Sequence, residues 1–333
     1  MAVGAPLRVV IAGFGSIGRR HLQNLRQLEP TADITIFRRP SDDVSIPVGA
    51  NRVVHSAEQA WPSMDAALIT GPSSVHLAHA RAAAASGAHL FIEKPLANTP
   101  DGLPELLADC RANGLALLVA YNFRFYQPLQ LMRDAVQSGC IGRVVSARAE
   151  VGQYLPDWRP GADYRQSVTA RAELGGGVLL ELSHEIDYLR WLVGEVVAVG
   201  ARTGRLAGLE IDVEDVAELL IEFDNGALGS VHLDMVQRTP SRACKLIGTD
   251  GTLTWDGMTN AVRLFSAATR EWTDLHPAAP VDRNEMYLAE LRHFLDCVRG
   301  TASSGISGDD GLRVVQIAAA ARRSSETRQM VTV

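Results

Sequence analysis

Short apolar runs alternate with amphipathic stretches through the first third of the chain. Apolar runs without polar alternation are typical of parallel strands that helices cover on both faces. The pattern therefore predicts βαβ units that form a doubly wound, parallel α/β Rossmann domain. The apolar runs are residues 7–13, 34–37, 66–71, 89–93 and 115–121, and the amphipathic stretches between them include residues 17–28, 75–85 and 102–113.

The pattern changes after residue 121. Several alternating segments with turn signals, among them DNG at 224–226 and TDG at 249–251, occupy residues 196–265. Glycine tolerates the positive φ that such hairpin turns require. This half predicts an α+β domain with an open, mainly antiparallel sheet. The remaining expected elements are helices over 128–138, 178–192, 283–298 and 311–324, a strand over 144–154 and a polar loop over 155–167.

Composition excludes several classes of protein. The 333 residues are 47% hydrophobic and 21% charged, which is ordinary for a globular chain and not for a disordered one. A formal charge of −6 argues against nucleic acid or an anionic membrane as the main partner. No apolar run approaches the roughly 18 residues of a membrane helix, and residues 1–7 are too short and too weakly charged for a signal peptide. The four scattered cysteines form no CxxC pair, so we expect neither a disulfide framework nor a metal site. Together these features predict a cytoplasmic location.

Gly13, Gly15 and Gly18 form a GxGxxG pattern directly after the first predicted strand and at the start of a helix. In that context the first glycine permits the tight turn, the second lets the backbone approach a pyrophosphate, and the third lets helix and strand pack closely. Ser16 and Ile17 complete the helix start, whose N–H groups and positive dipole end attract the phosphates. The pattern predicts a dinucleotide site, and the alternative is a merely structural turn.

The end of the second predicted strand indicates which dinucleotide binds. An acidic residue there would bind the ribose 2′-OH of NAD, whereas arginine favours the 2′-phosphate of NADP. This chain has Arg38 and Arg39 at that point and no carboxylate until Asp42. Asp33 lies before the strand, away from the adenosine end. We therefore expect NADP(H) to be preferred and NAD(H) to be the alternative; two solvated surface arginines are the other interpretation.

Glu93, Lys94 and Pro95 follow the fourth apolar run. The carboxyl edge of a parallel sheet is where ligands bind, so a lysine at this position is expected to face the cofactor. A Lys–Pro pair after a strand is also a common loop signal without a catalytic role.

Several motifs together resemble the Gfo/Idh/MocA family of NAD(P)-dependent oxidoreductases over nearly the whole chain. They are GFGSIGRRH, TGPSSVH at 70–76, EKPLANT, YNFRF at 121–125, GGGVLLELSHEID at 175–187 and the closing helices. The resemblance implies that Lys94 is the lysine of the family's EKP motif, near the nicotinamide. It also implies that Pro72, Ser73 and His76 line the nicotinamide ribose.

The resemblance also implies the domain organisation. We expect a dinucleotide-binding Rossmann domain over residues 1–121, a substrate-binding and oligomerisation domain over 122–310, and a C-terminal helix and tail over 311–333. The open sheet of the second domain often mediates assembly in this family, so a homodimer or homotetramer is expected.

The segment after the glycine triplet at 175–177 carries a candidate catalytic histidine. On a continuous helix, His184 lies opposite an apolar stripe, with Glu181 and Asp187 about 60° to either side. In the family an acid and a histidine on this helix work with the EKP lysine. The usual acid stands four residues before the histidine, where this chain has Leu180, so Glu181 is its expected substitute and Asp187 the alternative partner. A lone helical histidine is otherwise more often structural. The apolar stripe opposite His184 comprises Leu179, Leu182, Ile186 and Leu189.

A polar loop before the glycine triplet is the candidate substrate site. Its aromatic side chains can stack on the apolar face of a sugar, and its arginines can bind carboxylate or phosphate. The alternative is a surface loop that its own aromatics anchor. The candidates in the loop are Tyr154, Trp158, Arg159, Tyr164 and Arg165, and Asn122 and Arg124 are expected at the domain junction.

These residues predict an oxidoreductase that moves a hydride between nicotinamide C4 and a secondary alcohol or ketone of a sugar, sugar derivative or polyol. His184 would act as general base or acid, and Lys94 would donate to the reacting oxygen. Two alternatives remain: a non-catalytic NADP-binding sensor or scaffold, and a reductase of a non-sugar carbonyl or imine.

Overall fold

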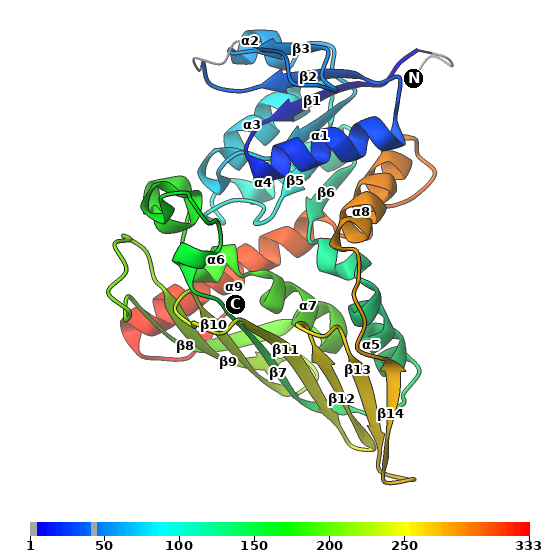
Figure 1. Cartoon of the computed structure of the whole chain (residues 1–333), viewed down its shortest axis with the longest axis vertical. Coiled ribbons are helices and arrows are strands. Elements are labelled where there is room, and N and C mark those ends of the chain that lie inside the picture. Colours follow the sequence, from blue (N-terminus) through cyan, green and yellow to red (C-terminus); the bar gives the residue numbers. More distant parts are fainter. Residues whose placement is uncertain (1–4, 41–44) are drawn as a thin grey trace. The chain divides into compact units, whose positions relative to one another are not determined.

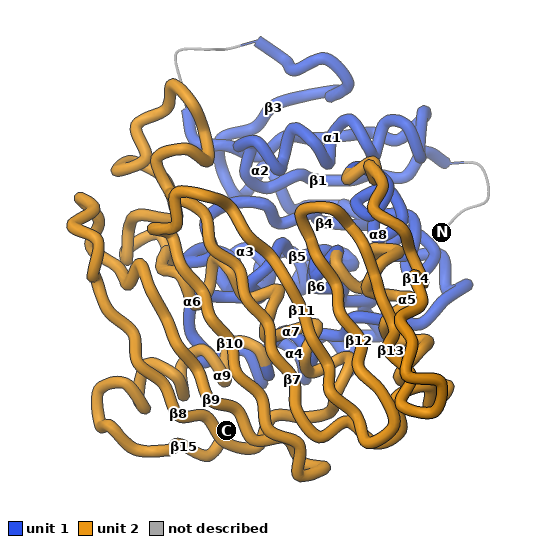
Figure 2. The backbone as a smooth tube through the Cα atoms, turned by 60° about the horizontal axis from the view of Figure 1, so that its bottom comes forward, with its two compact units in different colours: residues 1–122, 284–313 blue, residues 123–283, 314–333 orange. Residues whose placement is uncertain are grey.

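The computed structural model describes residues 5–40 and 45–333. The chain forms two compact units (Figure 2). Unit 1 contains residues 1–122 and 284–313, and unit 2 contains residues 123–283 and 314–333. Residues 284–313 therefore lie in unit 1, whereas the sequence-based division placed 284–310 with the substrate domain. The functional assignment of the two parts stays a prediction.

Unit 1 is built on a six-stranded sheet with strand order β3-β2-β1-β4-β5-β6. Every strand pair of this sheet is parallel in the described part of the chain. The expected Rossmann fold is confirmed. Its strands are β1 (Arg8–Ala12), β2 (Asp33–Phe37), β3 (Arg52–Val54), β4 (Ala66–Ile69), β5 (His89–Glu93) and β6 (Leu117–Ala120).

Helices accompany this sheet on both faces (Figure 1). Burial explains the uninterrupted apolar runs, because Val9, Val10 and Ile11 of the central strand are fully inaccessible to solvent. The helices are α1 (Ser16–Leu28), α2 (Ala57–Ala60), α3 (Ser73–Ala85), α4 (Leu103–Ala112) and α8 (Arg283–Val298, of which Arg283 lies in unit 2); α9 (Gly308–Thr327) begins in unit 1 and ends in unit 2.

Unit 2 contains a nine-stranded sheet with strand order β14-β13-β12-β11-β7-β10-β9-β8-β15. Only the β7–β10 pair is parallel in the described sheet, so the expected mainly antiparallel sheet is confirmed. The strands are β7 (Val144–Gly152), β8 (Val196–Gly204), β9 (Val216–Phe223), β10 (Leu228–Asp234), β11 (Ser241–Gly248), β12 (Gly251–Asp256), β13 (Val262–Ser266), β14 (Glu271–His276) and β15 (Val331–Thr332).

Helices pack on one face of the nine-stranded sheet. Strand β9 shows the alternation that results: Ala217, Leu219 and Ile221 are buried, while Glu218 and Leu220 on the opposite face are exposed. The elements of unit 2 outside the sheet are α5 (Gln127–Gln137), α6 (Val178–Glu181) and α7 (His184–Val193), with 3₁₀ turns η1 (Asn122–Phe125, of which Asn122 lies in unit 1), η2 (Leu155–Asp157), η3 (Tyr164–Gln166), η4 (Val168–Ala170) and η5 (Ala172–Leu174).

The expectation of one continuous helix over 178–192 is wrong. Helix α6 ends at Glu181, and Leu182 leaves the helical conformation with φ −101° and ψ 31° before α7 begins at His184. The apolar pattern did not reveal the break, because residues on both sides of it are buried: Leu179 and Ile186 are 0% exposed. Angular positions calculated for a continuous helix therefore do not relate Glu181 to His184.

Candidate active site

The glycine loop lies at the carboxyl end of β1, and its three glycines have distinct structural roles. Gly13 has φ +103°, and a Cβ there would lie 2.5 Å from the backbone N of Gly71. A Cβ on Gly18 would lie 2.4 Å from the carbonyl O of Gly13. A Cβ on Gly15, in contrast, would meet nothing within 4 Å. The protein itself thus requires glycine at Gly13 and Gly18, whereas Gly15 leaves its backbone open to a ligand.

The start of α1 completes an anion site beside this open backbone. Helix α1 begins at Ser16, and its first turn contains no acidic residue. Its leading N–H groups and positive dipole end therefore face no competing carboxylate from that turn. Both features fit the pyrophosphate of a dinucleotide.

Two arginines, Arg38 and Arg39, follow the end of β2. The Arg38 guanidinium donates to the carbonyl O of Ser45 at 3.3 Å and lies 6.0 Å from the ring centroid of Phe14, while Arg39 is exposed. Asp33 is the first residue of β2, where the sequence analysis placed it before the strand, and pairs with Arg52 at 2.9 Å at the opposite end of that strand. Asp42 lies outside the described residues.

Lys94 follows directly after β5, and the Lys94–Pro95 peptide is cis. Its backbone N–H donates to Glu93 Oε2 at 3.2 Å, and Glu93 Oε1 lies 2.7 Å from Nε2 of His21 on α1. His21 is fully buried, and Glu93 is 8% exposed. His21 was not among the predicted site residues, although its position three residues after Gly18 places it on the first turns of the glycine-loop helix.

His76 joins two predicted parts of the cofactor site. Its Nδ1 lies 2.9 Å from the carbonyl O of Pro95, and its Nε2 lies 2.9 Å from the carbonyl O of Gly71. Burial lowers the pKa of His76 below its usual value, although the two carbonyls oppose this effect. Pro72 precedes α3 and Ser73 begins it. Thr70, two residues before Pro72, donates from its hydroxyl to the carbonyl O of Gly13 at 2.8 Å, so this segment meets the glycine loop as well as the EKP turn.

In unit 2, His184 is the first residue of α7 and stacks on Phe123 of η1. The ring centroids are 4.6 Å apart, and the ring planes are inclined by 26°. Glu181 is the last residue of the preceding helix α6 and is partly exposed. Its partnership with His184 stays a prediction.

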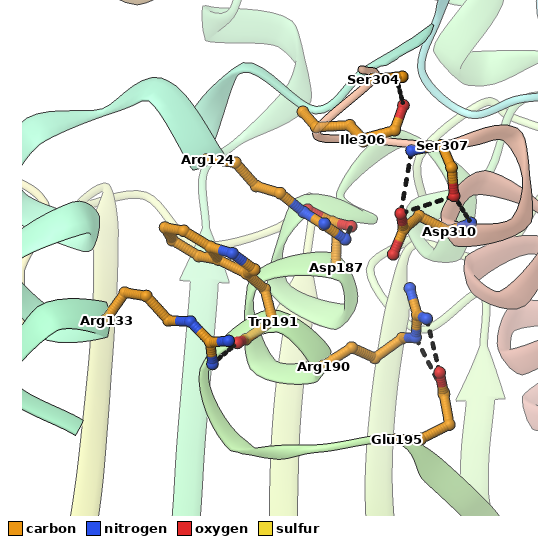
Figure 3. A network of polar contacts seen from close by, with 10 residues as sticks. All are labelled: Arg124, Arg133, Asp187, Arg190, Trp191, Glu195, Ser304, Ile306, Ser307 and Asp310. Carbon is orange, nitrogen blue, oxygen red and sulfur yellow. Dashed lines mark hydrogen bonds and ion pairs between the residues drawn. The ribbon is translucent and has the colours of Figure 1, made fainter. Parts of the chain in front are cut away.

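Asp187, the alternative partner of His184, forms a buried ion pair with Arg124 (Figure 3). Arg124 donates from Nε and Nη2 to the two Asp187 oxygens at 3.0 and 2.7 Å. The side chains are 8% and 1% exposed. Buried charges need such pairing, and the structure thus joins two residues to which the sequence analysis gave separate roles.

Further contacts hold α7 at its far end. Arg190 pairs with Glu195 at 2.6 Å, and Arg133 of α5 donates to the carbonyl O of Trp191 (Figure 3). The helix that begins with His184 is therefore fixed by cation contacts along its length.

Contacts within the chain anchor the predicted substrate loop. Trp158 Nε1 donates to the carbonyl O of Gln153 at 2.9 Å. Arg165 pairs with Asp163 and Glu210 at 2.8 and 3.0 Å. These bonds match the loop-anchoring interpretation, and the substrate roles of Trp158 and Arg165 stay predictions.

The remaining loop candidates differ in accessibility. The Arg238 guanidinium lies 3.6 Å from the ring centroid of Tyr154, so one face of that ring is covered. Tyr164 accepts the backbone N–H of Glu210 at 3.3 Å through its hydroxyl oxygen, whereas Arg159 is exposed. Asn122 is only 4% exposed, and within the described residues its Oδ1 accepts no hydrogen bond.

Two searches over the described residues bear on other kinds of site. No cluster of three or more His, Cys, Asp or Glu side chains suited to a metal ion occurs in residues 5–40 and 45–333. In the same part of the chain, no helix is both long and apolar enough to cross a membrane.

A parallel Rossmann sheet with this glycine loop, followed by a large, mainly antiparallel sheet, is the architecture of a dinucleotide-binding protein of two units. Residues 7–121 match the family model described as "Oxidoreductase family, NAD-binding Rossmann fold". Residues 129–254 match the model of the "GFO/IDH/MocA C-terminal domain". The chain belongs to the GFO/IDH/MocA family of oxidoreductases, as its motifs indicate.

Characterised relatives match most of the chain. The 1,5-anhydro-D-fructose reductase of Ensifer adhaerens is 26% identical over 86% of this chain and 85% of its own length. The myo-inositol 2-dehydrogenase of Thermotoga maritima is 25% identical over 98% of both chains. Among solved structures, levoglucosan dehydrogenase in complex with NADH has a TM-score of 0.88 at 23% identity and covers 99% of both chains, which shows that the fold is shared.

Proposed function

We propose that the protein moves a hydride between nicotinamide C4 and a secondary alcohol or ketone of a sugar, sugar derivative or polyol. The relatives support this substrate class, because their names specify an anhydro-sugar and an inositol as the compounds on which they act. The Arg-containing loop at 155–167 supports a polar substrate.

The nicotinamide cofactor, when bound, supplies the group that accepts or releases the hydride. The open backbone at Gly15 and the start of α1, with Ser16 and Ile17, would hold its pyrophosphate. Pro72, Ser73 and His76 would line the nicotinamide ribose, since their loop contacts the EKP turn through His76. Glu93 would act indirectly, by fixing the backbone of Lys94.

Arg38 and Arg39 support a preference for NADP(H). A guanidinium binds a phosphomonoester with two charge-assisted hydrogen bonds, and residues 37–40 offer no carboxylate for the ribose 2′-OH of NAD. NAD(H) is the alternative, because the solved levoglucosan dehydrogenase complexes contain NADH.

Lys94 would donate a hydrogen bond from its ammonium group to the reacting oxygen and stabilise the alkoxide charge that develops there. His184 would take the proton from an alcohol, or return it to a ketone, since an imidazole titrates near neutral pH. Glu181 or Asp187 would support the imidazole. Asn122, Arg124, Trp158, Arg159, Tyr164 and Arg165 are the proposed substrate contacts.

The observation that carries this proposal is the position of Lys94. It stands at the carboxyl end of β5 in the same parallel sheet whose β1 ends in the glycine loop, and β4 alone lies between those two strands. In open parallel sheets, ligands bind outside the carboxyl ends of the strands.

The test is a nicotinamide absorbance assay of the purified protein against sugars, keto-sugars, inositols and sugar nucleotides with NADP(H) and NAD(H). We expect turnover of at least one polyol, and a loss of roughly 100-fold or more in kcat for both Lys94→Ala and His184→Ala. Wild-type turnover in both variants would refute the assignment. Tight cofactor binding without turnover of any compound would favour a sensor or scaffold.

We also propose that the protein forms a homodimer or homotetramer through the face of the nine-stranded sheet that carries Leu220 and Leu228. Each of these side chains is 52% exposed on that face. Exposed apolar side chains on a broad sheet are typical of an interface. Light scattering of the protein in solution tests this, and a monomer at micromolar concentration would contradict it.

A cytoplasmic location stays a prediction.

A further inference from the structure

Phe123 is the centre of an aromatic cluster in unit 2. It is 9% exposed and stacks face to face with His184. Tyr126 also stacks on it, with centroids 5.7 Å apart and ring planes inclined by 26°. Trp255 meets Phe123 edge to face at 6.0 Å and 87°. The ring that contacts the candidate catalytic imidazole thus also contacts two other rings.

A partly buried ion pair supports the same ring: the Arg242 side chain is 22% exposed and the Glu185 side chain is fully buried. The Arg242 guanidinium lies 4.3 Å from the ring centroid of Phe123. Arg242 also donates from Nε and Nη2 to the two oxygens of Glu185, at 2.7 and 2.9 Å. Glu185 is fully buried and directly follows His184 on α7. His184 therefore contacts Phe123, Phe123 contacts Arg242, and Arg242 pairs with Glu185, the residue next to His184 in the chain. These contacts form a closed set.

These contacts restrict rotation of the His184 imidazole. A histidine side chain has two rotatable bonds, and the second has a broad energy profile, so the ring plane is poorly fixed unless something packs against it. Face-to-face contact with Phe123 fixes that plane, and an aromatic face also favours a cationic imidazolium over it. Proton transfer requires the reacting nitrogen to be aimed within narrow limits.

We propose that Phe123, braced by Arg242 and Glu185, is a positioning residue that holds the His184 imidazole in the plane required for proton transfer. The proposal rests on the proposed function of His184. Of the two described rings that stack on Phe123, those of Tyr126 and His184, the His184 ring is the one to which the proposed function gives an acid–base role.

The test compares Phe123→Leu with Phe123→Trp and with the matched control Tyr126→Leu, which removes a ring from the same cluster without removing the stack on His184. The first measurement is NMR of protein with labelled histidine, in which His184 is assigned from His184→Gln. An aromatic face shifts the protons above it upfield. We expect that shift to be lost in Phe123→Leu and kept in Phe123→Trp and Tyr126→Leu.

The second measurement is steady-state kinetics with a substrate from the absorbance screen. We expect kcat to fall roughly 10- to 100-fold in Phe123→Leu, with KM and cofactor affinity within about threefold of wild type. Phe123→Trp should recover most of kcat, and Tyr126→Leu should keep it.

Two results would overturn the proposal. One is a His184 signal in Phe123→Leu that is unchanged from wild type, and the other is an unchanged kcat after the upfield shift has been lost. If Phe123→Leu does not fold, the double variant Arg242→Gln/Glu185→Gln removes the ion pair without leaving a buried charge unpaired; it must lower kcat with KM preserved, or the proposal fails. The NMR measurement needs no substrate, so it tests the stack even if the proposed function proves wrong.

Discussion

Glu93 Oε1 lies 2.7 Å from His21 Nε2, in a buried contact between the end of β5 and helix α1. The other Glu93 oxygen accepts the backbone N–H of Lys94. The helix that begins at the glycine loop and the turn that carries the candidate catalytic lysine therefore share one carboxylate. This arrangement fixes the Lys94 backbone relative to the expected pyrophosphate site.

Replacing His21 should disturb Lys94 without touching substrate. In His21→Leu we expect the free energy of unfolding to fall by about 1–3 kcal/mol, because a buried carboxylate oxygen loses its partner. We also expect kcat to fall about tenfold, since small displacements of a catalytic group are costly. His21→Gln keeps an N–H donor and should recover most of kcat. Urea unfolding and the absorbance assay measure both effects, and a His21→Leu variant with wild-type kcat would contradict the coupling.

Two glycines of the same loop should respond oppositely to alanine. Gly15→Ala places a Cβ in open space, so we expect the free energy of unfolding to change by no more than about 0.5 kcal/mol. Cofactor affinity should fall roughly tenfold or more, because that Cβ occupies the path of the pyrophosphate. Gly13→Ala should instead destabilise the protein by about 2–4 kcal/mol, because its φ is +103° and its Cβ would collide with Gly71. Calorimetry measures the stability of each variant, and cofactor titration measures its affinity. If Gly13→Ala and Gly15→Ala lost the same cofactor affinity and had the same stability, the predicted difference would be contradicted.

Arg38 should determine the preference for the cofactor phosphate. We expect Arg38→Ala to weaken NADP(H) binding roughly 10- to 100-fold, which corresponds to about 1.5–3 kcal/mol for a charged hydrogen bond. NAD(H) binding should stay within about twofold of wild type, because NAD lacks the 2′-phosphate. Arg52→Ala is the matched control, since Arg52 pairs with Asp33 at the other end of β2. Equal or better turnover with NAD(H), unchanged in Arg38→Ala, would refute the preference.

The buried Arg124–Asp187 pair should matter for stability. Asp187→Leu leaves the Arg124 guanidinium buried without its partner, so we expect a loss of about 3–5 kcal/mol. The double variant Arg124→Met/Asp187→Leu should recover most of that loss, because both charges are then removed. Urea unfolding of the single and double variants measures the coupling. If Asp187→Leu lowered kcat at wild-type stability, Asp187 would be the partner of His184 instead.

His232 should make stability depend on pH. Burial lowers the pKa of His232, but hydrogen bonds with Glu218 and Asp234 outweigh this effect and raise it overall. A raised pKa means that the folded state binds the proton more tightly, so the stabilisation is fully present below about pH 6.5 and is lost as pH rises through the raised pKa. We expect the Tm difference between wild type and His232→Gln to be largest near pH 6 and to shrink towards pH 9. A difference that is constant from pH 6 to 9 would show that the imidazolium contributes nothing.

Local patterns were sufficient to place the glycine loop after β1 and Lys94 after β5. Gly13, Gly15 and Gly18 act through spacing along a few residues, and Lys94 follows a strand that its own apolar run defines. The break between α6 and α7 could not be predicted in this way, because Leu182 is apolar and buried like its helical neighbours. Hydrophobic periodicity reports burial, and burial is the same on both sides of that break.

By itself the sequence determined the Rossmann and antiparallel classes of the two sheets, the glycine loop and the lysine after β5. All of these follow from interactions between residues close together along the chain. Tertiary structure alone decided that Glu93 meets His21, that Arg124 meets Asp187 and that His184 stacks on Phe123. The partners in each of these pairs lie on different elements. Buried charges and rings must find partners, but which partner each one meets depends on how those elements pack, and spacing along the chain does not encode it.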